Sequence, residues 1–257
     1  MFSRTAWVAI FLALPLGCKA NAPPPVRVAA AADLAHAFDE IQAAFVAQTP
    51  SRLTLTVGAS GLLAKQITQG APFDLFLAAN SGYVEQVVRA SACDGSTVHV
   101  YARGRLVIWT KRAQAATLTL AALAEPRFAH IAIANPEHAP YGAAAREALT
   151  GAKVWSQIAS RVVYGENVQQ ALELAKTGNA DAAIVGLSLA LAQQSGSWAP
   201  VDETLYAPID QSLVVCKHGE NPAGARRLAD FLSAPAGRTI LRKYGFLLPG
   251  EAVAKAP

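Results

Sequence analysis

Short apolar runs alternate along the chain with segments in which apolar residues recur every three or four positions. The short runs predict buried strands, and the spaced patterns predict amphipathic helices. The first pair is a strand over 26–31 and a helix with apolar positions Leu34, Phe38, Ile41 and Phe45. This strand–helix order continues through the chain, so we predict an α/β fold with parallel strands and helices on both faces of the sheet.

The remaining elements fall into two groups. We expect further strands at 53–57, 74–77, 105–110, 131–134, 182–185 and 211–216, and further helices at 62–69, 142–149, 168–176, 223–232 and 235–244. A chain of 257 residues allows two modest units. We therefore expect a first lobe over 26–104, a second lobe over 105–210, a return to the first lobe over 211–250 and a tail over 251–257.

The N-terminal segment has the pattern of an export signal. Arg4 precedes an apolar stretch over 7–16, which is typical of a signal peptide and too short to span a bilayer. We assign residues 1–17 to this signal and the Pro-rich 18–25 to a tether. Cys18 follows a small residue at the end of the run, as in a bacterial lipoprotein, so we expect it to be lipidated; ordinary signal cleavage nearby is the alternative. Either outcome places the mature protein outside the cytoplasm.

The distribution of charged residues and cysteines limits the kinds of ligand that the protein can bind. The formal net charge is +4, but Lys and Arg are scattered and form no basic stripe, so we expect no nucleic-acid binding. Cys93 and Cys216 lack the spacing of a metal or redox motif. In an oxidising compartment they could form a disulfide or remain two thiols, and the sequence leaves both open.

Motifs for catalysis are sparse. The chain has no zinc-protease, phosphate-loop or dinucleotide motif. Residues 58–62 differ by one position from the nucleophile elbow of serine hydrolases. An esterase with Ser60 as nucleophile and His138 or His36 as base is therefore an alternative from another class, although we expect no enzymatic activity.

Four segments place a strand or turn directly before a helix, namely 31–33, 58–61, 139–142 and 165–168. Helix starts carry unpaired backbone N–H groups and the positive end of the helix dipole. In open α/β sheets such turns meet at the carboxyl ends of the strands, where ligands bind. Together the four segments predict a site for an anion that needs no Lys or Arg.

The same segments carry a family resemblance. The chain resembles the molybdate-binding proteins of bacterial ABC importers, a branch of the periplasmic solute-binding proteins. The matching stretches occur in family order at 30–34, 58–61, 70–76, 134–142, 164–168 and 243–246. The resemblance implies the two-lobed, type II periplasmic-binding-protein fold, in which each lobe is a mixed sheet flanked by helices and the ligand lies in the interlobe cleft.

The resemblance also implies a function. The protein would capture molybdate, with tungstate as a second candidate ligand, by hinge closure and deliver it to a membrane permease with a cytoplasmic ATPase. It would act as a monomer, without a cofactor, in the periplasm or on the outer cell surface, anchored through Cys18. A receptor for another small oxyanion or for a carboxylate is the alternative within the same class.

Carried over by position, the resemblance implies five ligand-binding residues. Ala32 and Asp33 fall on the first-strand position, Ser60 on a hydroxyl donor, Tyr141 on a second-lobe position and Val168 on a backbone N–H donor. The last four would contact the oxygens of molybdate, and a metal enters the site only as the centre of that anion.

Two positions depart from the family. Some relatives have Ser or Asn where this chain has Asp33, and an ionised Asp can only accept hydrogen bonds. Asp33 could cap its helix and offer only its backbone N–H, could be protonated and donate, or could indicate another ligand; we favour the cap. Some relatives have a ligand Tyr where this chain has Gly186, and we expect Tyr141 to fill that space. We expect His138 and Asp74 to be structural.

Overall fold

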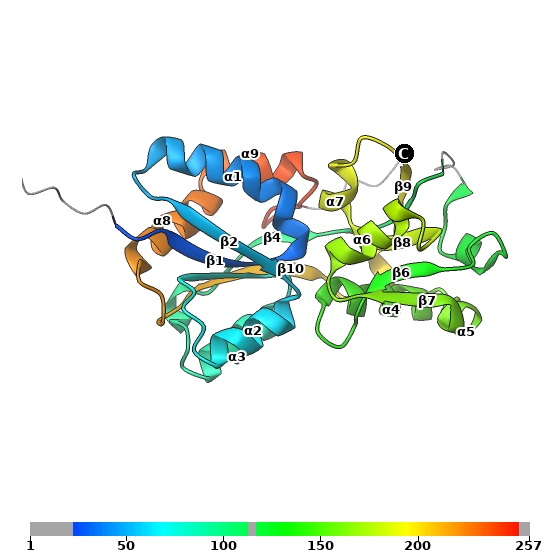
Figure 1. Cartoon of the computed structure of the whole chain (residues 1–257), viewed down its shortest axis with the longest axis horizontal. Coiled ribbons are helices and arrows are strands. Elements are labelled where there is room, and N and C mark those ends of the chain that lie inside the picture. The colour runs from blue at the N-terminus through cyan, green and yellow to red at the C-terminus, as the bar shows by residue number, and fades with distance from the viewer. Residues whose placement is uncertain (1–22, 113–116, 252–257) are drawn as a thin grey trace, which may run out of the picture.

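The computed structural model describes residues 23–112 and 117–251. They form two lobes side by side, each with one five-stranded sheet flanked by helices (Figure 1). This arrangement confirms the predicted α/β, two-lobed fold class. The predicted signal peptide, Cys18 and residues 252–257 lie outside the described residues.

The first lobe is built around a sheet with strand order β2-β1-β3-β10-β4. Its strands are β1 (Val26–Ala31), β2 (Leu53–Gly58), β3 (Leu75–Ala78), β4 (His99–Gly104) and β10 (Ile209–Val215). Strand β1 is parallel to β2 and β3, whereas β10 is antiparallel to β3 and β4. The sheet is therefore mixed, and the parallel sheet predicted from element order is wrong for the strand that returns from the second lobe.

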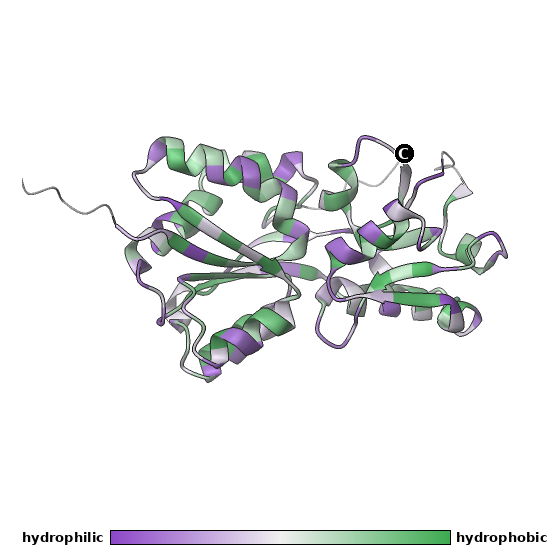
Figure 2. Cartoon of the chain, in the orientation of Figure 1, coloured by the Kyte–Doolittle hydropathy of each residue, from purple (hydrophilic) through white to green (hydrophobic). Residues whose placement is uncertain are grey.

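Helices cover both faces of this sheet (Figure 1). They are α1 (Ala35–Gln48), α2 (Ser60–Thr68), α3 (Ser81–Arg89), α8 (Pro222–Ser233) and α9 (Pro235–Lys243). One core joins α1, α8 and α9 to the strands, and another lies under α2 and α3. Figure 2 shows hydrophobic residues along the strands, where both cores meet the sheet.

The second lobe has strand order β7-β6-β8-β5-β9. Its strands are β5 (Leu106–Thr110), β6 (Ile131–Ala134), β7 (Val162–Gly165), β8 (Ala182–Gly186) and β9 (Ser197–Pro200), and its helices are α4 (Pro140–Gly151), α5 (Trp155–Ile158), α6 (Val168–Thr177) and α7 (Leu187–Leu191). Strand β6 is parallel to β7 and β8, and β5 is antiparallel to β8 and β9. Short 3-10 turns occupy Ala32–Leu34, Gly95–Thr97, Ala121–Ala124, Ala159–Arg161 and Glu203–Leu205. No helix in the described part of the chain is long and apolar enough to cross a membrane.

The chain crosses between the lobes twice, from β4 into β5 and again into β10. At the first crossing the Arg105 carbonyl accepts a hydrogen bond from Leu187 N–H at 2.9 Å, and Arg105 Nε donates to the Gly245 carbonyl at 3.1 Å. At the second crossing the β10–β4 register shifts between Gln211 and Ser212. Two chain segments that cross side by side allow the lobes to rotate relative to each other, as in a hinge.

Cys93 and Cys216 form a disulfide in the first lobe. The two residues face each other in an isolated antiparallel bridge, and both are buried. Cys216 N–H donates to the Asp74 carbonyl at 2.8 Å, directly before β3 begins. The bridge thus lies at the start of β3, away from the second lobe.

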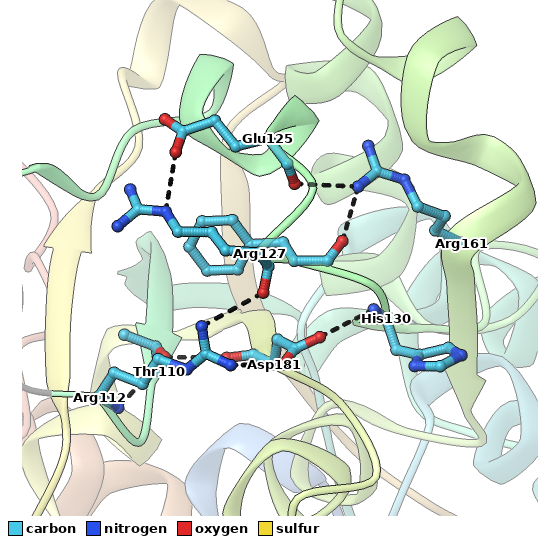
Figure 3. A network of polar contacts seen from close by, with 8 residues as sticks. Thr110, Arg112, Glu125, Arg127, His130, Arg161 and Asp181 are labelled. Atoms are coloured by element: carbon cyan, nitrogen blue, oxygen red, sulfur yellow. Dashed lines mark hydrogen bonds and ion pairs between the residues drawn. The ribbon is translucent and has the colours of Figure 1, made fainter.

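Arginine side chains of the second lobe are paired at the end of the sheet that is farther from the crossings (Figure 3). Arg112 Nη2 lies 2.9 Å from Asp181 Oδ1, and Thr110 Oγ1 donates to the Asp181 carbonyl at 2.8 Å. Arg161 donates to the carbonyls of Glu125 and Phe128. These positive charges stabilise the outer loops of the lobe.

Candidate functional site

A small cavity lies between the lobes where strands of both sheets end. Its volume is about 10 Å³, close to the space that one water molecule requires. The lining residues are Ala31, Ala32, Asp33, Gly58, Ala59, Ser60, Ala79, Ala139, Pro140, Tyr141, Asn167 and Val168. The structure thus brings together all five residues that the sequence singled out, from four separate segments of the chain.

Three helices begin at this cavity. Ser60 is the first residue of α2, Pro140 of α4 and Val168 of α6. The Asn167 side chain caps α6 by accepting from the N–H groups of Gln169 and Gln170, both at 3.0 Å. The positive ends of three helix dipoles converge on one small space, which favours an anion.

The lining contains no Lys, Arg or His. Its side-chain donors are the neutral hydroxyls of Ser60 and Tyr141 and the amide of Asn167. An anion bound there would be held by neutral hydrogen bonds and helix dipoles. Cationic side chains of the chain lie elsewhere, and some are in ion pairs, such as Arg112 with Asp181 and Arg127 with Glu125 in the second lobe.

Ser60 is fully buried, and its hydroxyl has one partner among the described residues. Its Oγ accepts a hydrogen bond from the Ala79 N–H at 3.0 Å. A hydroxyl has one proton to donate besides its acceptor lone pairs. The Ala79 contact therefore orients Ser60 while leaving its proton for a ligand.

Asp33 does not cap its helix, so the favoured sequence interpretation of this residue is wrong. The turn Ala32–Leu34 has no side-chain cap. Instead, Asp33 Oδ2 accepts hydrogen bonds from Tyr141 Oη at 2.9 Å and from Gln211 Nε2 at 2.7 Å. Tyr141 belongs to the second lobe and Gln211 to the strand that returns to the first lobe. Their two hydrogen bonds hold the carboxyl group away from the N–H groups of its own helix start.

The Asp33 carboxyl is completely buried, and its other oxygen, Oδ1, has no hydrogen-bond partner among the described residues. Burial raises the pKa of Asp33 to about 6, although the hydrogen bond from Tyr141, the residue's own backbone N–H and the hydrogen bond from Gln211 each lower it. At neutral pH the ionised form of this carboxyl is therefore destabilised by its burial.

Tyr141 occupies the space beside Gly186, as expected. A Cβ atom at Gly186 would lie 3.0 Å from Tyr141 Cε1, and one at Gly104 would overlap the Tyr141 hydroxyl. Burial, followed by the nearby Asp33 charge, raises the Tyr141 pKa well above its usual value. Tyr141 is therefore a neutral donor, and the two glycines leave room for its ring at the crossings.

Three residues of this cluster were not predicted from the sequence. Ser188 Oγ donates to the Asp33 carbonyl at 2.8 Å, and Tyr101 Oη donates to Gln211 Oε1 at 3.4 Å. Asp33 thus joins the first lobe to Tyr141 and Ser188 of the second lobe and to Gln211 at the second crossing. The available signal was the run of polar residues Asp210, Gln211 and Ser212 within the strand β10.

The lobes also meet through the backbone at the mouth of the cavity. Gly61 N–H donates to the His138 carbonyl at 2.9 Å, across the interlobe cleft. His138 Nε2 lies 2.9 Å from the Glu166 carbonyl within the second lobe, and the ring does not line the cavity. Asp74 accepts from the N–H groups of Arg27 and Asn221 in the first lobe. The expected structural roles of His138 and Asp74 match these contacts.

The two lobes, the double crossing and the small interlobe cavity define a hinged solute-binding protein. The comparisons agree. The chain matches the bacterial extracellular solute-binding proteins over residues 26–247, and it belongs to this family. Members of this family act outside the cytoplasm and bind solutes without transforming them, so the esterase alternative is wrong.

Two relatives show how specific the match is. The chain is 36% identical to the molybdate-binding protein ModA of Rhodobacter capsulatus over 244 residues, which covers 95% of this chain and 96% of the relative. It is 32% identical to ModA of Azotobacter vinelandii over 248 residues, which covers 95% and 98%. The solved periplasmic molybdate-binding protein of Azotobacter vinelandii superposes with a TM-score of 0.81 at 28% identity, covering 87% of this chain and 99% of that one.

Proposed function

We propose that the protein captures molybdate, and also tungstate, between its lobes and delivers it to the membrane permease of an ABC importer that is driven by a cytoplasmic ATPase. The observation that carries the proposal is the interlobe cavity with three converging helix starts, neutral hydroxyls and no cation. Two relatives that match nearly the whole chain are named molybdate-binding proteins.

The donor set suits a tetrahedral dianion. An oxyanion has hydrogen-bond acceptors on all sides. Backbone N–H groups at helix starts can donate to these acceptors, and this arrangement avoids the desolvation cost of burying a Lys or Arg side chain. In this proposal Ser60 Oγ and the Val168 N–H donate to oxygens of the ligand, together with backbone N–H groups of Ala32 and Asp33. Tyr141 lines the same space and gives its one hydroxyl proton to Asp33 Oδ2. The protein binds as a monomer, and its closed surface is what the permease recognises.

We further propose that Cys18 is lipidated and holds the protein at a membrane surface. The support is the apolar run that ends at this residue and a similar Bacillus subtilis protein whose name describes a substrate-binding lipoprotein, 28% identical over 246 residues. Cys18 lies outside the described residues. Partition of the expressed protein into detergent, lost on Cys18→Ala, is the expected result.

Thermal unfolding with a panel of anions tests the proposed ligand. Molybdate or tungstate at 100 times the dissociation constant should add about 2.7 kcal/mol to the free energy of unfolding. Sulfate, phosphate and small carboxylates at the same ionic strength serve as controls. A shift with another oxyanion or with a carboxylate alone would favour the alternative ligand that Asp33 motivates, and no shift with any anion would contradict the proposal.

Ser60→Ala should weaken molybdate binding by about 0.5–3 kcal/mol, because one hydroxyl donor to a charged ligand is lost. The same change leaves the buried Ala79 N–H without its acceptor, so we also expect a lower free energy of unfolding without ligand. Calorimetry gives the affinity, and chemical denaturation separates the two effects. Unchanged affinity would remove the Ser60 hydroxyl from the site.

Gly61→Ala should weaken binding by preventing full closure of the lobes. A Cβ atom there would lie 2.9 Å from the His138 carbonyl and 2.8 Å from Tyr83 Oη, closer than packed atoms tolerate. Losing the interlobe backbone hydrogen bond should cost about 1 kcal/mol, or roughly five-fold in affinity. Gly151→Ala is the matched control, since its Cβ would meet Leu205 at an ordinary 3.4 Å. Equal affinities for the two variants would show that the Gly61 contact does not contribute to closure.

A further inference from the structure

We propose that Asp33 shares one proton between its Oδ1 and an oxygen of the bound ligand, so that each oxyanion binds together with one proton. The inference rests on the proposed function, because it assumes that an oxyanion occupies this cavity. It adds a requirement on the ligand, namely an oxygen that can take part in a hydrogen bond to a carboxyl group.

The first support is the position of the carboxyl group. Asp33 lines the cavity beside Ser60 and Tyr141, and its side chain is fully buried. Its Oδ2 is already occupied by the Tyr141 and Gln211 donors, whereas Oδ1 has no partner among the described residues. A buried acceptor without a donor is costly, so Oδ1 is the atom of this site that a ligand would complete.

The second support is the absence of a compensating cation. None of the ion pairs among residues 23–112 and 117–251 involves Asp33. The groups that face it are the Tyr141 hydroxyl from α4, the Gln211 amide from β10, Ser188 Oγ from α7 and, through Gln211, the Tyr101 hydroxyl from β4. Each of these groups is uncharged.

The tyrosines around Asp33 stay neutral over the whole useful pH range. Burial, and then the charge of Asp33, raises the pKa of both Tyr101 and Tyr141 well above the usual value. Behind Tyr141, burial raises the pKa of Tyr206 to about 12. None of the described groups that face Asp33 therefore supplies a positive charge, whereas a proton from solvent can do so.

An ionised Asp33 and a dianion side by side in one small interlobe cavity would repel strongly. One proton between them removes the repulsion and converts it into a charge-assisted hydrogen bond. The proton belongs to the pair: a protonated carboxyl with a dianion and a carboxylate with a protonated anion contain the same atoms. Both descriptions predict uptake of one proton when a dianion binds to the ionised site.

The pH dependence follows from the carboxyl group. Since the pKa of Asp33 is raised to about 6 by burial, the free protein at pH 8 holds Asp33 ionised, and binding must take a proton from solution. We expect uptake close to one proton per molybdate at pH 8 and about half a proton near pH 6. Over pH 7–9 the affinity should fall about tenfold per pH unit.

Isothermal titration calorimetry of the purified protein with sodium molybdate, in two buffers of different ionisation enthalpy, measures the proton uptake directly. Asp33→Asn keeps an acceptor for Tyr141 and Gln211 and places a permanent N–H donor at the other position, so proton uptake and the pH slope should both vanish. Ser60→Ala is the matched control: it loses affinity but keeps the uptake of one proton at pH 8.

Molybdate binding by the wild type at pH 8 without proton uptake would overturn this inference and leave the proposed function intact. Uptake of one proton that persists in Asp33→Asn would place the proton on another group and overturn it as well. No heat and no thermal shift with any oxyanion would instead contradict the proposed function. If Asp33→Asn does not fold by circular dichroism, the wild type still decides the question through the pH dependence of its proton uptake, which should fall to half near pH 6; uptake that stays at one proton down to pH 5 would overturn the inference.

Discussion

Asp33→Asn is expected to raise the free energy of unfolding of the ligand-free protein at pH 7.5 by up to roughly 3 kcal/mol. Burial raises the pKa of this carboxyl from 3.8 to about 6, and each pKa unit corresponds to about 1.4 kcal/mol. At pH 7.5 the folded protein holds an ionised carboxyl in a fully buried position, and a neutral amide of the same shape removes that cost. The amide N–H at the unpartnered Oδ1 position offsets part of the gain, so roughly 3 kcal/mol is its upper limit.

The sign of the pH effect follows from linkage. A raised pKa in the folded state means that Asp33 contributes stability below pH 4, where it is protonated in both states, and that this stability is lost as the pH rises through about 6. The advantage of Asp33→Asn should therefore be present at pH 7.5 and absent at pH 4. Chemical denaturation at the two pH values measures both numbers, and an equal gain at both would show that the charge is not the cause.

Asp74 provides the matched control. It is also fully buried, but its two oxygens accept from the N–H groups of Arg27 at 2.7 Å and Asn221 at 2.6 Å. Asp74→Asn would turn an amide N–H toward one of these donors, so we expect a loss of about 1–3 kcal/mol at pH 7.5. Opposite signs for two buried aspartates would separate a satisfied carboxylate from one that lacks a partner.

Removal of the Cys93–Cys216 disulfide is expected to lower the free energy of unfolding by about 2–5 kcal/mol. The two residues are 123 positions apart, and a cross-link over a long loop restricts the unfolded chain strongly. The bridge lies at the start of β3, whereas Ala79 after the end of β3 lines the cavity. Stability should therefore fall with little change in ligand preference.

The measurement is chemical denaturation with and without a thiol reductant, with Cys93→Ala/Cys216→Ala as the control. The double variant should have the midpoint of the reduced wild type and should not respond to the reductant. A wild-type midpoint that is the same under both conditions would show that the two cysteines are not joined in the folded protein.

Most strands found by sequence lie inside a sheet, and all the strands that were missed lie at an edge. The edge strand β2 was found as well, because its alternating Leu and Thr residues are a strong local strand signal. All seven predicted strands are present within two residues, and β3, β5, β6 and β8 are buried throughout. The missed strands, β4, β7 and β9, are sheet edges. They have exposed positions that dilute the apolar signal. Helix α3 was missed for a similar reason, since it buries only Val84 and Val87.

Sequence analysis located the parts of the site that depend on nearby residues, but not the contacts between residues that are far apart in the chain. Helix starts have local signals, so Ser60, Tyr141 and Val168 could be placed at a cavity from the sequence. The partners of Asp33 could not be placed, because Tyr141 lies 108 positions away and Gln211 lies 178 positions away. Capping was the best local explanation for an Asp before a helix, and it failed because folding supplied distant donors.

The place of β10 between β3 and β4 affects when the first lobe can be completed during synthesis. Residues up to β4 leave a gap in the first sheet that only β10, starting at Ile209, can fill, while the second sheet is complete once β9 has been made. A chain released from its N-terminus onward can therefore finish its second lobe first. The five proposed contact residues come no later than Val168, yet Gln211, which donates to Asp33, belongs to the last fifth of the chain. The site in its described form therefore requires nearly the whole chain.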